Sequence, residues 1–161
     1  MILSLDQSSN ATGFALFNKG KLITYGVIDL NKMPKGGEEE YTNKRIVLKN
    51  RLSEIITDNL VKLTLTEGVY GQNIKTCKIL SKVQGSVQDL CKELDIDCFS
   101  FANAGEWRKL IGVKGKKREE YKENTKQYVL TKYDIPDNLS DDEYDAIAIY
   151  DAYCVLAERE V

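Results

Sequence analysis

Histidine is absent from the 161-residue sequence. Without an imidazole, the chain cannot build a serine–histidine–aspartate triad, a cysteine–histidine pair or a histidine-ligated zinc site, so any metal must be held by oxygen. Cysteines are present at Cys77, Cys91, Cys98 and Cys154, but no two of them form a CxxC pair. We therefore expect reduced thiols, with neither a disulfide framework nor a thiolate-bound metal.

A long apolar run is also missing. No stretch approaches the roughly 18 to 20 consecutive apolar residues of a membrane helix, and the N-terminus lacks the basic and apolar regions of a secretory signal. We expect a soluble cytoplasmic protein with no membrane partner. Because 42% of the residues are hydrophobic, a chain of this length can form one core, and we expect a single domain over residues 1–161.

Charge is distributed unevenly, although the formal net charge is only −2. Residues 108–132 contain nine basic and three acidic side chains, a local charge of +6, so the rest of the chain is clearly acidic. A solvated helix face is the simplest interpretation of this block. A basic block in an acidic protein also fits a surface that faces phosphates beside an anionic site.

The first part of the chain has the pattern of three short strands, at 1–6, 12–17 and 21–28. Gly20, in the sequence NKGK, stands where a tight hairpin needs a positive φ, so these strands should form an antiparallel meander. Residues 29–43 contain a proline, two glycines and three consecutive glutamates, and they predict an exposed loop.

Helices and strands alternate in the remainder. Apolar residues at helical spacing predict helices at 43–60 and 75–94. Period-two alternation predicts a strand at 61–67 with Val61, Leu63, Leu65 and Glu67 on one face. The later predicted elements are a strand at 96–101, a helix at 103–112 between Asn103 as N-cap and Gly112 as terminator, and helices at 118–133 and 140–158. A strand reached through a helix normally lies parallel to its predecessor. The order predicts an α/β protein of ribonuclease H-like fold, with three antiparallel strands and then two parallel ones in a mixed five-stranded sheet flanked by helices.

Acidic residues occupy positions where strands end or a helix begins. Asp6 ends the first predicted strand and Glu67 the fourth, whereas Asp142 and Asp145 lie near the start of the last helix and on one side of it. Four converging carboxylates would repel one another unless divalent cations lay between them. Oxygen ligands favour Mg²⁺ or Mn²⁺, and two such ions can activate a water and stabilise the leaving oxygen of a phosphodiester.

Each carboxylate also has a simpler explanation. The S-x-x-E sequence at 140–143 is a capping box, so Asp142 alone could mark a helix start. Asp6 could cap a turn with the serines that follow it, and Glu67 could pair with a lysine. Asp145 fits such an explanation less well, because it lies beyond the first turn and directly precedes the apolar run AIAIY. Together, the four positions favour one shared cation site.

In order and spacing, these segments resemble the RuvC family of Holliday junction resolvases, in particular its small phage-type members. ILSLDQSSNATGFAL is similar to the family's opening strand and hairpin, LTEGVYGQN to its second motif, and SDDEYDAIAIYDA to its closing D-x-x-D-A-x-A helix. WRKLIGVKGKKREE matches the segment where the family keeps basic residues beside the scissile phosphate. Gln7 and Ser8 depart from the Pro-Gly that commonly follows the first aspartate, which leaves any sequence preference at the cleavage site open.

The resemblance implies a crossover junction endodeoxyribonuclease that cuts branched DNA symmetrically and leaves 5′-phosphate and 3′-hydroxyl ends. Its substrates would be four-way junctions, and also forks or three-way junctions. The implied catalytic groups are Asp6, Glu67, Asp142 and Asp145 as ligands of two Mg²⁺ or Mn²⁺ ions, together with Lys117 or Arg118 as the basic residue. The implied DNA-binding residues are Tyr70, at the position that meets DNA at the crossover, and Gln72, Asn73, Lys75, Arg108, Lys109, Lys114, Lys116, Lys117 and Arg118.

The resemblance further implies a homodimer, since two active sites must face one junction. It also implies a phage-encoded protein in the cytoplasm of a bacterial host. Helix 75–94 is the expected dimer contact. Its apolar residues could equally be used up by the core of one subunit, and the sequence leaves these alternatives open.

Other functions also stay open at this point. The opening LDQ looks like the phosphate loop of sugar kinases with the actin-like fold, although that fold needs a second lobe and a much longer chain. A relative with the same fold could process structured RNA, and a branch-binding protein with inactive carboxylates would bind DNA without Mg²⁺-dependent nicking. Cleavage of a four-way DNA junction, compared with that of structured RNA, separates these possibilities.

Overall fold

The computed structural model describes residues 1–31, 37–71 and 73–159. Its sheet has the strand order β3-β2-β1-β4-β5. The antiparallel pairs are β1 with β2 and β2 with β3, whereas β4 lies parallel to both β1 and β5. The predicted fold class is therefore confirmed. The strands are β1 (Ile2–Gln7), β2 (Ala11–Asn18), β3 (Lys21–Asp29), β4 (Leu63–Glu67) and β5 (Asp97–Phe101).

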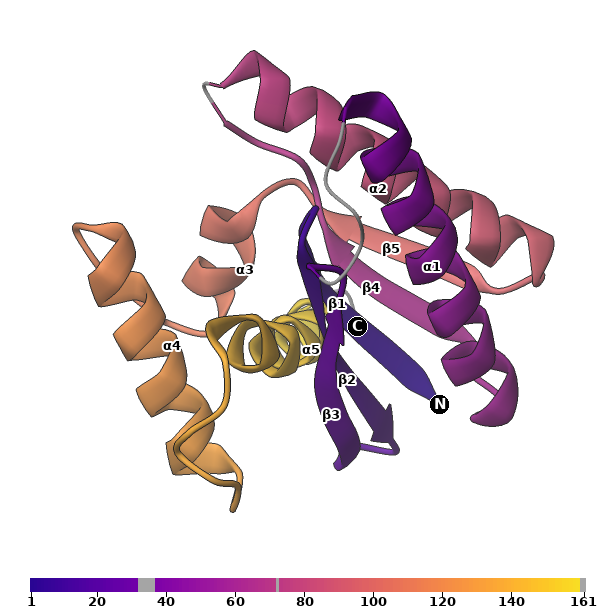
Figure 1. Cartoon of the computed structure of the whole chain (residues 1–161). Helices are drawn as coiled ribbons and strands as arrows, with labels where there is room; N and C mark the ends of the chain where they lie inside the picture. The colour runs from indigo at the N-terminus through magenta and orange to yellow at the C-terminus, as the bar shows by residue number, and fades with distance from the viewer. Residues whose placement is uncertain (32–36, 72, 160–161) are drawn as a thin grey trace.

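Helices cover both faces of this sheet (Figure 1). They are α1 (Gly37–Asp58), α2 (Ile74–Glu93), α3 (Ala104–Leu110), α4 (Arg118–Lys132) and α5 (Asp141–Arg159). The helices α1 and α2 pack on one face, and α5 crosses β1 and β2 on the other, with α3 and α4 beside it.

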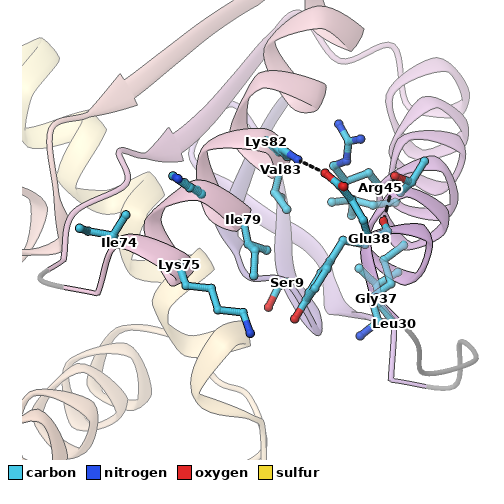
Figure 2. Close-up of a pocket in the computed structure, with 15 residues that line it drawn as sticks. Ser9, Leu30, Gly37, Glu38, Arg45, Ile74, Lys75, Ile79, Lys82 and Val83 are labelled. Atoms are coloured by element: carbon cyan, nitrogen blue, oxygen red, sulfur yellow. Dashed lines mark hydrogen bonds and ion pairs between the residues drawn. The ribbon is translucent and has the colours of Figure 1, made fainter.

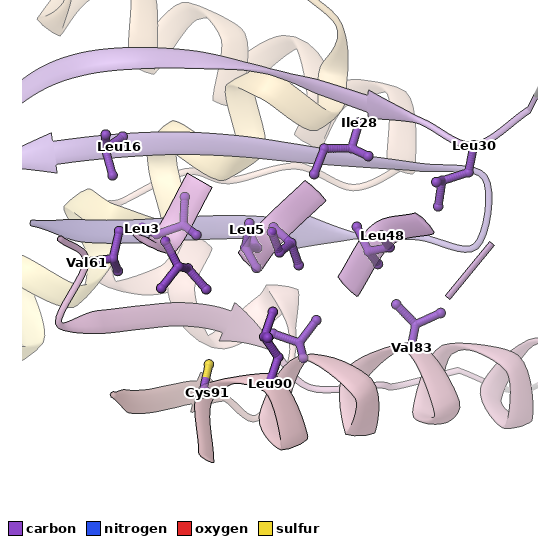
Figure 3. Close-up of a cluster of buried hydrophobic side chains, with 13 residues drawn as sticks. Leu3, Leu5, Leu16, Ile28, Leu30, Leu48, Val61, Val83, Leu90 and Cys91 are labelled. Carbon is purple, nitrogen blue, oxygen red and sulfur yellow. The ribbon is translucent and has the colours of Figure 1, made fainter. Parts of the chain in front are cut away.

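Alternate side chains of β1 contribute to two hydrophobic cores, one on each face. Leu3 and Leu5 pack with residues of α1 and α2 in the cluster shown in Figure 3. Ile2 packs on the other side, in the cluster that contains Leu65 and the buried face of α5. Because the alternation continues along the strand, Asp6 lies on the face of the sheet that α5 covers.

Several predicted turns and caps are confirmed. Lys19 and Gly20, with φ values of 49° and 83°, form the hairpin between β2 and β3. Asn103 caps α3 by accepting a hydrogen bond from the backbone N–H of Glu106, and Gly112 follows the helix with a φ of 74°. The four cysteines are free.

Two predicted boundaries are wrong. The loop predicted at 29–43 is helical from residue 37 onward, while its residues 32–36 lie outside the described part of the chain. Three glutamates occupy the first turn of α1, where the helix dipole favours negative charge. The strand predicted at 61–67 begins only at Leu63, and Val61 packs in the core opposite to that of Leu65.

In the described ranges, no helix combines the length and the apolar character needed to cross a membrane.

Candidate active site

The first two carboxylates meet because β1 and β4 are parallel neighbours. Their register pairs Ser4 with Leu65, and two residues further along each strand stand Asp6 and Glu67. Side chains two residues apart point to the same face, so both carboxylates project toward α5 at the carboxyl ends of the strands. This edge is where the sequence predicts a cation site.

Helix α5 brings the other two carboxylates to the same edge, and Gly13 in β2 makes that approach possible. Gly13 pairs with Asp6 across the two strands. A Cβ atom at Gly13 would overlap the backbone carbonyl oxygen of Asp142, far inside the separation that non-bonded atoms keep. The absence of a side chain at Gly13 therefore sets how closely the start of α5 can lie to Asp6.

The predicted capping box at the start of α5 is present. The backbone N–H of Ser140 donates to the Glu143 carboxylate at 2.9 Å, and the backbone N–H of Glu143 donates to Oγ of Ser140 at 3.3 Å. The side chain of Asp142 takes part in neither bond, and a hydrogen bond with Asp6 contributes to its electrostatics instead. Ser140 and Glu143 thus cap the helix without Asp142. The side chain of Asp142 interacts with Asp6 in the carboxylate cluster instead.

The electrostatics of the cluster reflect burial and mutual repulsion. Burial raises the pKa of Asp6 well above its usual range, and the nearby charges of Glu67, Asp145 and Asp142 raise it further. Burial raises the pKa of Asp145 to about 6, although Arg108 opposes the shift. The pKa values of Glu67 and Asp142 are also raised, mainly by burial. The four carboxylates therefore form one electrostatic unit that is short of positive charge.

Two consecutive residues of α3 hold two of these carboxylates. Trp107 is fully buried, and its indole N–H donates to Oε2 of Glu67 at 2.7 Å. The Arg108 guanidinium donates to Oδ2 of Asp145 at 2.9 Å in an ion pair that is largely buried. The short helix α3 thus fixes the orientation of Glu67 and Asp145.

The donor set fits hard divalent cations, because it consists of carboxylate oxygens alone and carries more negative charge than Arg108 can balance. As the side chains stand, however, no three acidic or cysteine side chains of the described residues are arranged to hold a metal ion. The contacts of Trp107 and Arg108 direct one oxygen each of Glu67 and Asp145 toward α3. The arrangement therefore has the right ligands, and side-chain rotations would be needed to bring them onto a shared ion.

The basic residues predicted to bind DNA between positions 108 and 118 fall into two groups. Arg108 points into the carboxylate cluster, whereas the others are exposed and lie on α3, on the loop after it and at the start of α4: Lys109, Lys114, Lys116, Lys117 and Arg118. Lys117 occupies the N-cap position of α4, where its side chain forms no capping hydrogen bond. For Lys117 and Arg118 the structure gives no contact with the carboxylates, so their catalytic role stays a prediction.

The residues predicted between β4 and α2 have different environments. Tyr70 is 83% exposed and borders a small pocket of about 50 Å³ that Gln7 and Glu67 also line. Asn73 is the N-cap of α2, and its side chain accepts a hydrogen bond from the backbone N–H of Thr76. Gln72 lies outside the described residues.

Lys75 faces another cavity. Its side chain lines a hollow of about 620 Å³ between α1 and α2, shown in Figure 2, where Ile79 and Val83 form part of the wall. This cavity lies on the sheet face opposite to α5 and contains none of the four carboxylates. The structure thus separates Lys75 from the carboxylate cluster.

The sequence predictions missed two residues that shape the site, Trp107 and Gly13. Trp107 is the single tryptophan of the chain, and a buried indole N–H almost always needs an acceptor. That rule could have suggested a polar partner for Trp107 but not which one. Nothing in the sequence around Gly13 distinguishes it from a glycine that merely bends a strand.

Comparisons by sequence find no matching protein-family model and no matching curated protein. Comparison by structure finds matches over nearly the whole chain. Thermus thermophilus RuvC in complex with a Holliday junction substrate is 12% identical, with a TM-score of 0.73 over 98% of this chain and 94% of that one. The fowlpox virus resolvase, in complex with its substrate Holliday junction DNA, is 15% identical, with a TM-score of 0.61 over 98% and 97%. The yeast mitochondrial Holliday junction resolvase is 15% identical, with a TM-score of 0.58 over 98% and 80%.

The sheet order, the helices on both of its faces and these matches define the class: the chain is an α/β protein with a ribonuclease H-like fold. Within that class, its fold is the one found in RuvC and in other Holliday junction resolvases.

Proposed function

We propose that this protein is a metal-dependent endonuclease that resolves four-way DNA junctions. The observation that carries the proposal is the convergence of Asp6, Glu67, Asp142 and Asp145 from β1, β4 and α5 at one edge of the sheet. The folds that match this chain over nearly its full length belong to proteins whose names describe junction resolution. A site made of carboxylates alone suits phosphodiester hydrolysis without histidine.

The four carboxylates would hold two Mg²⁺ or Mn²⁺ ions. When bound, the ions would supply the activation of water and the stabilisation of the leaving oxygen, which yields 5′-phosphate and 3′-hydroxyl ends. Trp107 keeps Glu67 oriented through its indole N–H, and the packing of α5 on Gly13 keeps Asp142 close to Asp6. The chain's contribution is to gather four carboxylates at one edge of the sheet.

Basic and aromatic side chains around this edge would bind the DNA. Residues 114–118 contribute three lysines and one arginine, all exposed, which suit contacts with the phosphate backbone. Tyr70 is exposed beside Glu67 and can stack on a base near the branch point. These contacts favour a substrate whose strands separate at the active site.

Symmetric cutting of a junction requires two active sites, and we propose a homodimer for this reason. Most of the apolar face of α2 is used within the subunit, since Val83, Val87 and Leu90 are buried in its own core. Ile74, at the start of α2, is 73% exposed and remains available for a partner. Sedimentation of the protein alone and with one junction would measure the stoichiometry, which we expect to be two chains per junction.

The test of the proposed function is a cleavage assay with labelled four-way junctions, replication forks, three-way junctions and linear duplexes. We expect paired nicks near the branch point with Mg²⁺ or Mn²⁺, and none with a chelator. A structured RNA serves as the competing substrate. Faster cleavage of that RNA than of the junction, or junction binding without any nicking, would contradict the proposal.

A further inference from the structure

Arg108 occupies the place where the four carboxylates need positive charge. Its guanidinium donates to Oδ2 of Asp145 at 2.9 Å, and its charge opposes the raised pKa values of Asp6, Glu67 and Asp145. One side chain therefore acts on three of the four carboxylates at once. It therefore offsets part of the unfavourable burial of these three carboxylates, while Lys122 acts on Asp142.

The guanidinium is nevertheless held by few hydrogen bonds. Its Nε atom is buried and has no hydrogen-bond partner among the described residues, although a buried donor normally has one. Its planar group lies 4.6 Å from the ring centroid of Trp107 and 5.3 Å from that of Tyr121. Aromatic faces attract a guanidinium without fixing its hydrogen bonds, so this environment allows the group to move.

The paired oxygen of Asp145 is the point at which a metal ion and Arg108 would meet. An Asp145 oxygen that accepts from Arg108 points toward α3, and the current arrangement of the carboxylates holds no metal ion within the described residues. A divalent cation that takes this oxygen as its ligand competes with the Arg108 guanidinium for its lone pairs and its negative charge. Arg108 and a divalent cation are thus competing partners of that oxygen.

We propose that Arg108 is an exchangeable internal counter-ion, which neutralises the carboxylate cluster before metal binds and which a divalent cation displaces from Asp145. The inference rests on the proposed function, because it assumes that Asp145 is a metal ligand. Once displaced, the guanidinium has both its free Nε–H and its former Asp145 donor available for an anion. Metal binding and anion binding at this edge would then be linked through one side chain.

Calorimetric titration of the DNA-free protein with Mn²⁺ tests the competition. Arg108→Gln removes the competing cation, and we expect its affinity for Mn²⁺ to rise about tenfold. Lys92→Gln is the charge-matched control, because it removes a positive charge from an exposed position of α2, on the sheet face opposite to α5, and we expect a change of less than about twofold. An equal change in both variants, or no gain in Arg108→Gln, would overturn the inference.

A measurement on the wild-type protein keeps the test independent of whether the variant folds. For this measurement the metal is Mg²⁺, which is diamagnetic. The Arg108 Nε–H resonance in a ¹⁵N-correlated NMR spectrum should shift as Mg²⁺ is added. The midpoint of the shift should match that of a calorimetric titration with Mg²⁺. A resonance that stays fixed while heat shows binding would refute the displacement and leave the proposed function standing. The complete absence of metal binding by the wild-type protein would instead remove the basis of both.

Discussion

At the scale of single residues, the site depends on carboxylates that are buried together. An isolated buried charge is unfavourable by several kcal/mol, and here four carboxylates share one small region with Arg108 as a balancing cation. Their raised pKa values show that the folded chain tolerates this charge poorly. Such an arrangement stabilises nothing by itself, which is why we assign it a functional role.

Asp145→Asn should abolish metal-dependent cleavage. The amide keeps the size of the side chain but removes the negative charge, and we expect the cleavage rate to fall roughly a thousandfold because the metal's stabilisation of several kcal/mol is lost. Junction binding, measured by fluorescence anisotropy, should change by less than about threefold. Asp141→Asn is the control. Asp141 lies on the same helix turn, is more exposed than Asp145 and pairs with Lys122, so this variant should cleave at the wild-type rate. Equal loss of binding and cleavage would mean that Asp145 is structural.

The stability of the metal-free protein should depend on the ionisation of Asp145. Its pKa rises from 3.8 to about 6 on folding, so between these values the folded protein binds more protons than the unfolded chain. The free energy of unfolding therefore falls as the pH rises from about 4 to about 6, by roughly 3 kcal/mol at full extent. Denaturation with chelator present, for the wild type and for Asp145→Asn, measures the difference between the two proteins. A difference that stays constant over this pH range would contradict the assignment.

The sequence allowed the four carboxylates to be chosen but not the residues that hold them. Asp6 and Glu67 follow from strand ends, and Asp142 and Asp145 from their spacing on a helix. The contacts made by Trp107 and Arg108 depend on where α3 lies against the sheet, which no local pattern encodes. The roles of the carboxylates as metal ligands remain predictions.

At the scale of elements, the site depends on how closely α5 lies against β2. Gly13→Ala would place a methyl group in steric overlap with the backbone of α5 at Asp142, and a backbone atom cannot move aside without disturbing the helix. We expect a loss of about 1–3 kcal/mol in the free energy of unfolding, measured with denaturant. Cleavage should also fall by more than tenfold, because Asp142 moves away from Asp6.

Gly85→Ala is the matched control for that variant. Gly85 lies inside α2, and a Cβ atom there would meet no atom within 4 Å beyond its own stretch of helix. Alanine should therefore stabilise the protein by up to about 1 kcal/mol and leave cleavage unchanged. Gly13→Ala with wild-type cleavage would show that the contact between α5 and β2 does not position Asp142.

Element boundaries were predictable where a local signal exists. The hairpin at Lys19 and Gly20 and the caps of α3 carry such signals. The start of α1 carries no such signal, because three consecutive glutamates fit a solvated loop as well as a first helical turn. Tertiary ion pairs such as Glu38 with Lys82 favour the helix. Val61 was misassigned since its burial comes from the opposite core, which period-two alternation cannot reveal.

At the scale of the whole molecule, a net charge of −2 must be reconciled with DNA binding. Attraction to phosphates has to come from a local surface, because the protein as a whole repels polyanions weakly. The exposed basic side chains of residues 114–118 lie on the loop after α3 and at the start of α4, near the helix that contacts the carboxylates. The hairpin that contains Lys19 and Lys21 lies at the opposite end of β2 from Gly13 and the active-site edge.

Neutralising the basic segment should therefore reduce the salt dependence of junction binding. For a variant with Lys116→Gln, Lys117→Gln and Arg118→Gln, each lost phosphate contact should lower the slope of log affinity against log salt by about 0.9. A drop of about 2 to 3 in the absolute slope is expected, together with weaker binding at every salt concentration. Lys19→Gln with Lys21→Gln is the control that removes exposed lysines from the far end of the sheet, and its slope should match that of the wild type. If both variants lowered the slope equally per charge removed, general charge rather than a defined DNA surface would explain the binding, and the position of the DNA proposed here would be wrong.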